Sequence, residues 1–249
     1  MKKKNIKALI FGASNGIGKK LSYELVKKNI NVTLVSRKKN KLKKIVKELN
    51  NIKKGNNYYS INLLKKDNPK NISKKISKKF GFHELIIHCV GGGLGVKEIN
   101  SPKKDWIKVW NFNAGIILEA NAVLIPKMIS KRRGKIICIS SLSTKISNVK
   151  HDKIPYMASK AYLNNYIKNS AKLLQKKNIK IFGILPGPML VSGKYWEKLF
   201  IKDRQNVNRF LKKNYNMNTL ISVNKVVNKI LMIIFDKKKF SSGTLIQIK

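Results

Sequence analysis

The chain has 249 residues and a hydrophobic content of 43%, so it can bury a large core and is a poor match for a disordered protein. Its 55 lysines and arginines against 11 acidic residues give a formal net charge of +44. The charge is spread along the whole chain as Lys-Lys pairs, which argues against one nucleic-acid-binding arm and fits the codon bias of an A/T-rich genome. A charge selected for binding nucleic acid is the alternative, and it predicts a steep salt dependence of that binding.

Cysteine usage and the apolar segments bear on the compartment. Cys89 and Cys138 stand in apolar runs typical of buried strands, so we expect free core thiols in a reducing compartment. The basic N-terminus leads into a short apolar segment, 8–11, which is too short for a signal peptide. No apolar run approaches the length of a membrane span. These features predict a cytoplasmic protein without membrane contact.

Strand and helix patterns alternate along the whole chain. Short apolar runs predict buried strands at 7–11, 32–35, 58–63, 85–90, 135–139, 179–185 and 244–248. Apolar residues at helical spacing predict helices at 16–28, 42–49, 72–80, 106–129, 156–175 and 223–235. The alternation predicts one α/β domain over residues 1–249, a doubly wound parallel sheet of the Rossmann type. Residues 192–220 interrupt it and predict a small helical flap over the substrate pocket.

A glycine-rich turn joins the first predicted strand to the first predicted helix. Glycine lets the backbone approach a pyrophosphate closely, and a helix N-terminus offers free N–H donors and a positive dipole end. In this place the turn predicts a dinucleotide site formed by Gly12, Ser14, Asn15, Gly16, Ile17 and Gly18.

The end of the second predicted strand bears on the choice of cofactor. It reads Ser36-Arg37-Lys38-Lys39, with no carboxylate to repel a phosphate. A guanidinium offers a fork that grips phosphate, so we predict NADP(H) rather than NAD(H), with Arg37 at the 2′-phosphate. The alternative for Arg37 alone is a solvated surface charge.

Tyr156 and Lys160 are four residues apart in a predicted helix, so they share one face. Reduction of a carbonyl needs a hydride from a nicotinamide and a proton for the oxygen. A tyrosine hydroxyl can donate that proton, and we expect the neighbouring ammonium to lower its pKa. Such a pair arises often by chance in a lysine-rich chain, but here a strand ending in Ser140-Ser141 precedes it.

In their order, these motifs resemble the short-chain dehydrogenase/reductase family over nearly the whole chain. The turn resembles the family's T-G-x-x-x-G-x-G, with Phe11 in place of the threonine. The resemblance implies that Tyr156 is the acid/base and that Lys160 tunes it and binds the nicotinamide ribose. It implies that Ser141 polarises the substrate oxygen, with Ser143 as the alternative.

The resemblance also implies an asparagine that holds a water linking the lysine to solvent. Asn113 matches it, and Asn111 is the alternative. An asparagine that only pins a helix kink is the competing structural interpretation. Asn62 stands where the family has an aspartate near the adenine, and it keeps the ability to hydrogen-bond the base.

Two further family landmarks are present with changes. The family's Asn-Asn-Ala-Gly is here His88-Cys89-Val90-Gly91, which keeps Gly91 as a cofactor residue. His88 offers a replacement hydrogen bond in the central sheet. Pro186-Gly187 resembles the turn beside the nicotinamide, but the usual threonine is missing and Ser192 offers a hydroxyl instead. The last strand lacks the usual Asp-Gly-Gly ending.

The resemblance implies an NADP(H)-dependent oxidoreductase of a carbonyl or alcohol, without a metal, that forms a homodimer or homotetramer through helices 106–129 and 156–175. A 3-oxoacyl thioester on an acidic carrier protein suits the basic surface, although the altered motifs argue against a close match. A keto-sugar is the other substrate class. A non-catalytic NADP(H)-binding regulator is the second function, and the intact Ser-Tyr-Lys set argues against it.

Overall fold

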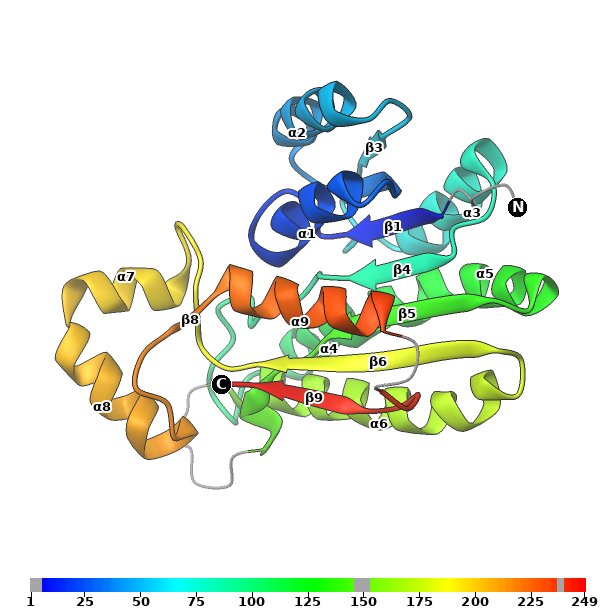
Figure 1. Ribbon diagram of the computed structural model, residues 1–249. Helices are drawn as coiled ribbons and strands as arrows, with labels where there is room; N and C mark the ends of the chain where they lie inside the picture. Colours follow the sequence, from blue (N-terminus) through cyan, green and yellow to red (C-terminus); the bar gives the residue numbers. More distant parts are fainter. Residues whose placement is uncertain (1–5, 146–152, 237–239) are drawn as a thin grey trace.

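The computed structural model describes residues 6–145, 153–236 and 240–249. Its centre is a seven-stranded parallel sheet of order β3-β2-β1-β4-β5-β6-β9 (Figure 1). The strands are β1 (Lys7–Phe11), β2 (Asn31–Ser36), β3 (Asn57–Ser60), β4 (Leu85–His88), β5 (Gly134–Ile139), β6 (Ile179–Pro186) and β9 (Leu245–Ile248). This order confirms the predicted doubly wound sheet.

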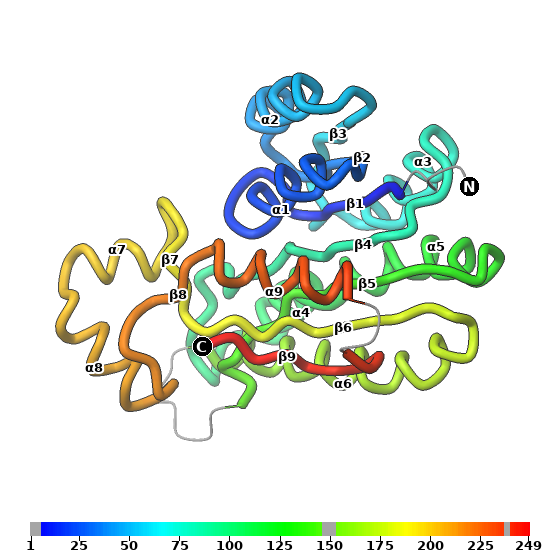
Figure 2. Tube along the Cα trace, in the orientation of Figure 1, coloured from blue at the N-terminus to red at the C-terminus, as the bar shows by residue number. Residues whose placement is uncertain are grey.

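Helices cover both faces of the sheet (Figure 2). One apolar cluster joins the sheet to α1 (Gly16–Lys27), α2 (Lys39–Ile52) and α9 (Val223–Phe235). A second cluster joins the opposite face to α3 (Asn68–Phe80), α5 (Ile116–Lys131) and α6 (Ile154–Gln175). The central strand β1 is apolar on both faces because its alternate residues enter different clusters: Ile10 lies in the first cluster and Leu9 in the second, and both are fully buried.

The helix predicted at 106–129 is longer and has a local distortion. It begins with α4 (Lys103–Trp110), continues through a π-helical turn (Asn111–Gly115) and ends with α5. Asn113 Nδ2 donates to the Val109 carbonyl, 2.8 Å away, within this widened turn. The sequence pattern does not predict this feature, since the apolar spacing continues through it.

The same helical stretch bears on the membrane prediction. Residues 103–131 are long and apolar enough to span a membrane by length and composition, although we expected no such segment. Half of its most apolar window is buried in the fold, and Ile116, Ala120 and Leu124 pack in the second cluster. These contacts make it a core helix of the sheet.

A separate helical element stands at the end of the sheet to which the strands point (Figure 1). It comprises α7 (Tyr195–Lys202) and α8 (Arg204–Tyr215). Two short strands, β7 (Met189–Leu190) and β8 (Ile221–Ser222), pair in parallel at its base. These two helices lie within residues 192–220, where the sequence predicts a helical flap.

The strand order reverses between β1 and β4, so the loops after these strands leave in different directions. Such a point in an open α/β sheet is the usual place of a ligand crevice. The predicted strand 58–63 ends early, at Ser60, because the chain turns at Asn62, whose Oδ1 accepts from the Leu64 amide.

Candidate active site

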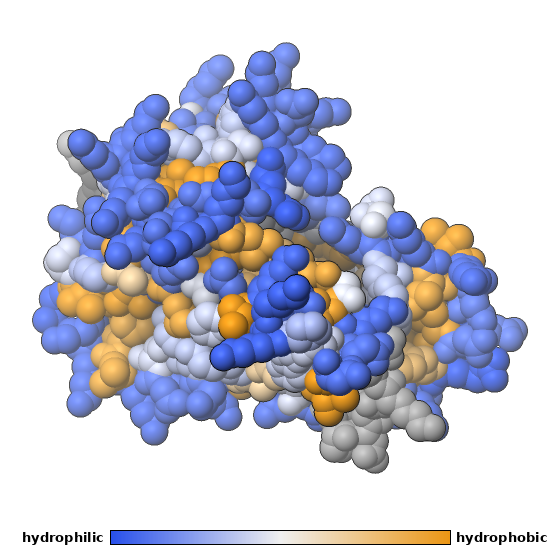
Figure 3. Space-filling view, turned by 180° about the vertical axis from the view of Figure 1, so that it is seen from behind, coloured by the Kyte–Doolittle hydropathy of each residue, from blue (hydrophilic) through white to orange (hydrophobic). Residues whose placement is uncertain are grey.

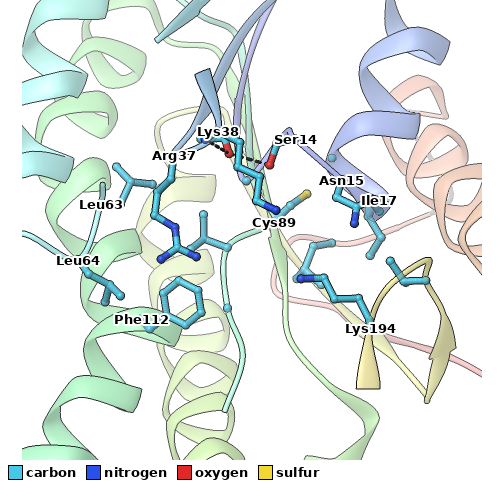
Figure 4. A pocket seen from close by; sticks show the side chains of 18 of the residues that line it. Ser14, Asn15, Ile17, Arg37, Lys38, Leu63, Leu64, Cys89, Phe112 and Lys194 are labelled. Carbon is cyan, nitrogen blue, oxygen red and sulfur yellow. Dashed lines mark hydrogen bonds between the residues drawn. The ribbon is translucent and has the colours of Figure 1, made fainter. Parts of the chain in front are cut away.

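A cavity of about 340 Å³ opens at the carboxyl ends of β1, β2 and β4. Its walls bring together nine of the residues predicted to bind a cofactor (Figure 4). They are Gly12, Ser14, Asn15, Gly16, Ile17, Gly18, Arg37, Asn62 and Gly91.

The glycine-rich turn is too tight for side chains at two of its positions. Gly12 has a φ of +83°, and a Cβ there would lie 2.8 Å from the carbonyl carbon of Cys89. A Cβ on Gly18 would lie 2.6 Å from the Gly12 oxygen. Asn15 precedes α1, and its Oδ1 accepts from the Gly16 amide at 2.8 Å. The turn therefore places the first N–H groups of a helix beside the cavity, which is a favourable place for an anion.

The rim at the end of β2 is basic. Arg37 and Lys38 line the cavity, and the Ser36 hydroxyl below them donates to Ser14 Oγ at 2.7 Å. None of the described residues that line the cavity is acidic. A cavity with a helix N-terminus, three cationic side chains (Arg37, Lys38 and Lys194) and no carboxylate fits the phosphates of a dinucleotide.

Asn113 and Lys160 meet beside the cavity. Lys160 is 2% exposed, and its Nζ donates to the Ile139 carbonyl at 2.7 Å. Asn113 Oδ1 accepts from the Gly92 amide at 2.9 Å. A Cβ on Gly91 would lie 2.7 Å from Asn113 Oδ1 and 2.9 Å from Lys160 Nζ. Because Gly91 also lines the cavity, it connects the two parts of the site.

Tyr156 and Ser141 form the other half of the predicted set. The Ser141 hydroxyl lies near enough to that of Tyr156 to lower its pKa, and the Tyr156 ring centre lies 6.0 Å from Lys160 Nζ. Ser143 lies in a 3-10 turn (Leu142–Lys145), and its Oγ is 2.8 Å from that of Ser141. The structure thus places Ser141 next to Tyr156 and Ser143 behind it.

Burial controls the protonation of this group. It raises the pKa of Tyr156, and the hydrogen bond with Ser141 opposes this rise. It lowers the pKa of Lys160 to about 8. We expected the ammonium to lower the pKa of Tyr156, but burial, the largest effect on this group, raises it.

Four predicted cofactor residues lie outside the cavity wall: Tyr156, Lys160, Pro186 and Gly187. Pro186 ends β6, and the Gly187 amide donates to the Ile248 carbonyl at 2.9 Å. Met189 and Val191, which follow them, line the cavity instead. Ser192, predicted to supply a hydroxyl, is not in its lining; the Ser192 carbonyl accepts from Asn15 Nδ2 at 3.4 Å.

His88 makes the replacement hydrogen bond that its position suggests. Its Nε2 lies 2.9 Å from Asn121 Oδ1 and its ring stacks on Phe11, with centroids 5.1 Å apart. Complete burial lowers its pKa to about 4, so His88 is neutral and donates from Nε2. Asn111 lies at the start of the π-helical turn, with its side chain against Gly115.

Several lining residues were not predicted. Ser36 and Lys38 flank Arg37, so their position at the strand end was a usable signal. Phe112 lies in the π-helical turn, and Lys194 comes from the flap. No spacing in the sequence marks these last two, because both depend on how distant segments fold against the turn.

Comparison with known proteins supports the family resemblance that the sequence motifs indicate. The family model described as short chain dehydrogenase matches residues 7–197. The 3-oxoacyl-[acyl-carrier-protein] reductase FabG of Thermotoga maritima is 27% identical over 197 residues, which are 79% of this chain and 78% of that protein. The FabG of Buchnera aphidicola subsp. Baizongia pistaciae is 33% identical over 183 residues, 72% of each chain.

Among solved structures, a 3-oxoacyl (acyl-carrier-protein) reductase from Agrobacterium tumefaciens with NADP bound superposes with a TM-score of 0.86 at 16% identity. The match covers 98% of this chain and 92% of that one, and at this identity it shows the shared fold. With the family match over residues 7–197, these findings show that the chain belongs to the short-chain dehydrogenase family of oxidoreductases.

Proposed function

We propose that this protein is an NADP(H)-dependent reductase in which Tyr156 protonates the oxygen of a carbonyl substrate. The observation that carries the proposal is the position of Gly91. It lines the cavity and leaves no room for a side chain between the cavity and the Asn113–Lys160 pair. The basic cavity and the Asn113–Lys160 pair are thereby neighbours, and we propose that together with Tyr156 they form one site.

NADP(H), when bound, supplies or accepts the hydride at its nicotinamide. Tyr156 gives its phenolic proton to the substrate oxygen, and Ser141, whose hydroxyl acts on that of Tyr156, holds that oxygen in place. Lys160 stabilises the phenolate that forms, through its positive charge. Asn113 fixes the Gly92 backbone and bonds the Val109 carbonyl within the widened turn of the helix, beside Lys160.

The protonation state favours the reductive direction. Because burial raises the pKa of Tyr156, the phenol carries its proton at neutral pH. This is the form that donates to a carbonyl oxygen. The oxidative direction needs the phenolate, so we propose that reduction is the faster direction at pH 7.

The substrate that we propose is a 3-oxoacyl thioester carried on an acidic carrier protein. Relatives named as 3-oxoacyl-[acyl-carrier-protein] reductases support it at 27% and 33% identity. The net charge of +44 suits an acidic partner. Figure 3 shows hydrophilic side chains over much of one face, with apolar patches between them.

The proposal is tested by measuring NADPH oxidation with 3-oxoacyl thioesters, free and carrier-bound, beside a panel of keto-sugars. We expect turnover with the thioesters and a lower KM for the carrier-bound form. Turnover with keto-sugars alone would contradict the thioester proposal and identify a keto-sugar as the substrate class. Binding of NADPH without turnover on any carbonyl would favour the non-catalytic regulator.

Arg37→Ala is expected to raise the Kd of NADPH by about tenfold or more and to leave that of NADH nearly unchanged. The reason is that only NADPH carries the 2′-phosphate that the guanidinium is proposed to bind. Calorimetric titration of both cofactors measures the two constants. Lys39→Ala, two residues away and outside the cavity lining, is the control with the same charge change. Equal losses for both cofactors would contradict this role for Arg37.

We also propose a cytoplasmic homodimer or homotetramer formed through the long helices. Apolar side chains are exposed on α4 and α6: Ile107 is 54% exposed and Tyr162 45%. Trp110 and Tyr162 pack edge to face, 5.6 Å apart, and form a ready contact surface. Light scattering on the purified protein should give two or four times 28.4 kDa, and a monomer would contradict the proposal.

A further inference from the structure

A lysine of the flap reaches the wall of the cavity. Lys194 immediately precedes α7 and lines the cavity, although it is distant in sequence from every other basic residue there. Figure 4 shows Lys194 and Arg37 extending into the cavity from opposite sides, with Ser14 and Cys89 between them. The cavity therefore has a cation at each end.

The backbone of the flap holds Lys194 in this place. Its amide donates to the Val191 carbonyl at 3.0 Å, and its carbonyl accepts from the Lys198 amide at 3.1 Å. Glu197 is the acidic residue nearest to Lys194 in the sequence, and its Oε2 accepts from the Gly193 amide at 2.6 Å. Within the described ranges, the ammonium of Lys194 forms no ion pair, so its charge is available to a ligand.

The end of the cavity that Lys194 faces is the glycine-rich turn. A Cβ on Gly16 would lie 3.4 Å from Val191 Cγ1, so the segment before Lys194 rests against the first turn of α1. The side chain of Val191 is apolar and cannot bond a ligand. Ser192 is exposed and lies outside the cavity lining. Lys194 is thus the polar side chain that this segment presents to the cavity.

We infer that Lys194 binds the pyrophosphate of the dinucleotide from the flap side. This inference rests on the proposed function, which places an NADP(H) molecule in the cavity. Arg37 then holds the 2′-phosphate at one end, while the N-terminus of α1 and Lys194 hold the pyrophosphate from two sides. Since Lys194 stands at the start of α7, the bound phosphate also ties the flap to the cofactor.

Substitutions of Arg37 and Lys194 should affect the two cofactors differently, because both cofactors contain a pyrophosphate and only NADPH has a 2′-phosphate. Lys194→Ala is expected to raise the Kd of NADPH and of NADH by the same factor, about five- to tenfold. Lys194→Arg retains the charge and should bind both cofactors nearly as well as the wild type. Lys198→Ala, one turn further along α7 and outside the cavity lining, has the same net charge as Lys194→Ala. It should bind both cofactors with the Kd of the wild type.

Calorimetry on the full chain measures the constants at several salt concentrations, and thermal unfolding without cofactor checks that each variant is folded. The Lys194→Ala variant should show a weaker salt dependence of cofactor binding. If the wild type binds both cofactors and Lys194→Ala binds them with unchanged Kd values, the inference is overturned. If Lys198→Ala lost as much cofactor affinity as Lys194→Ala, the cause would be the overall charge of the protein, and the inference would also be overturned. A wild type that binds neither cofactor would overturn the proposed function, and the inference with it.

Discussion

Tyr156→Phe is expected to lower kcat for NADPH-dependent reduction by about a thousandfold and to leave the Kd of NADPH within a factor of about two. The substitution removes the phenolic oxygen, the proposed proton donor, and keeps the ring. Reduction of a carbonyl then lacks its proton donor, and water has to supply the proton. The measurement is steady-state NADPH oxidation with the best thioester of the panel, together with a calorimetric titration of the cofactor.

The chain offers a matched control on the same helix. Tyr162 is 45% exposed and packs edge to face on Trp110, away from the cavity lining. Tyr162→Phe should therefore retain the wild-type kcat. If Tyr156→Phe kept more than about a tenth of the wild-type kcat, the proton would come from another group, and the role of Tyr156 would be wrong.

Much of the site follows from the sequence because its parts are local. The glycine-rich turn is continuous in the chain, and its function depends on a strand before it and a helix after it. Tyr156 and Lys160 are placed on one face by helical spacing alone. The parallel sheet follows from the alternation of apolar runs, because strands covered on both faces must be apolar throughout.

The parts that could not be predicted depend on contacts between distant segments. The π-helical turn at Asn111–Gly115 has an ordinary helical sequence, and it forms where Asn113 bonds both Val109 and Gly92. The position of Lys194 depends on how the flap rests against α1. The raised pKa of Tyr156 reflects burial, which the spacing to Lys160 does not reveal.

Lys160→Met is expected to reduce kcat/KM by about a hundredfold or more, because the variant has no ammonium to stabilise the Tyr156 phenolate. The wild type should show a related pH dependence. As burial lowers the pKa of Lys160 to about 8, the ammonium loses its proton above that pH, and the rate of reduction should fall. Steady-state rates between pH 6 and 10 measure both effects.

Lys160→Met lowers activity, but at pH 7 it should raise the free energy of unfolding, because it removes a buried charge. The pH dependence of that free energy shows whether Lys160 acts in the fold as a buried charge or only as a packing side chain. Below pH 8 the folded wild type keeps a buried ammonium, which costs free energy. Between about 8 and 10.5 the unfolded chain binds this proton and the folded chain does not, so the stability of the wild type rises with pH relative to Lys160→Met, by about 3 kcal/mol in all. Denaturant unfolding of both proteins without cofactor at pH 7 and pH 10 measures this difference. Lys168→Met, an exposed position two turns along α6, should show no such trend. A difference between wild type and Lys160→Met that does not change with pH would mean that Lys160 titrates normally in the fold, and the predicted fall of the rate above pH 8 would then be wrong.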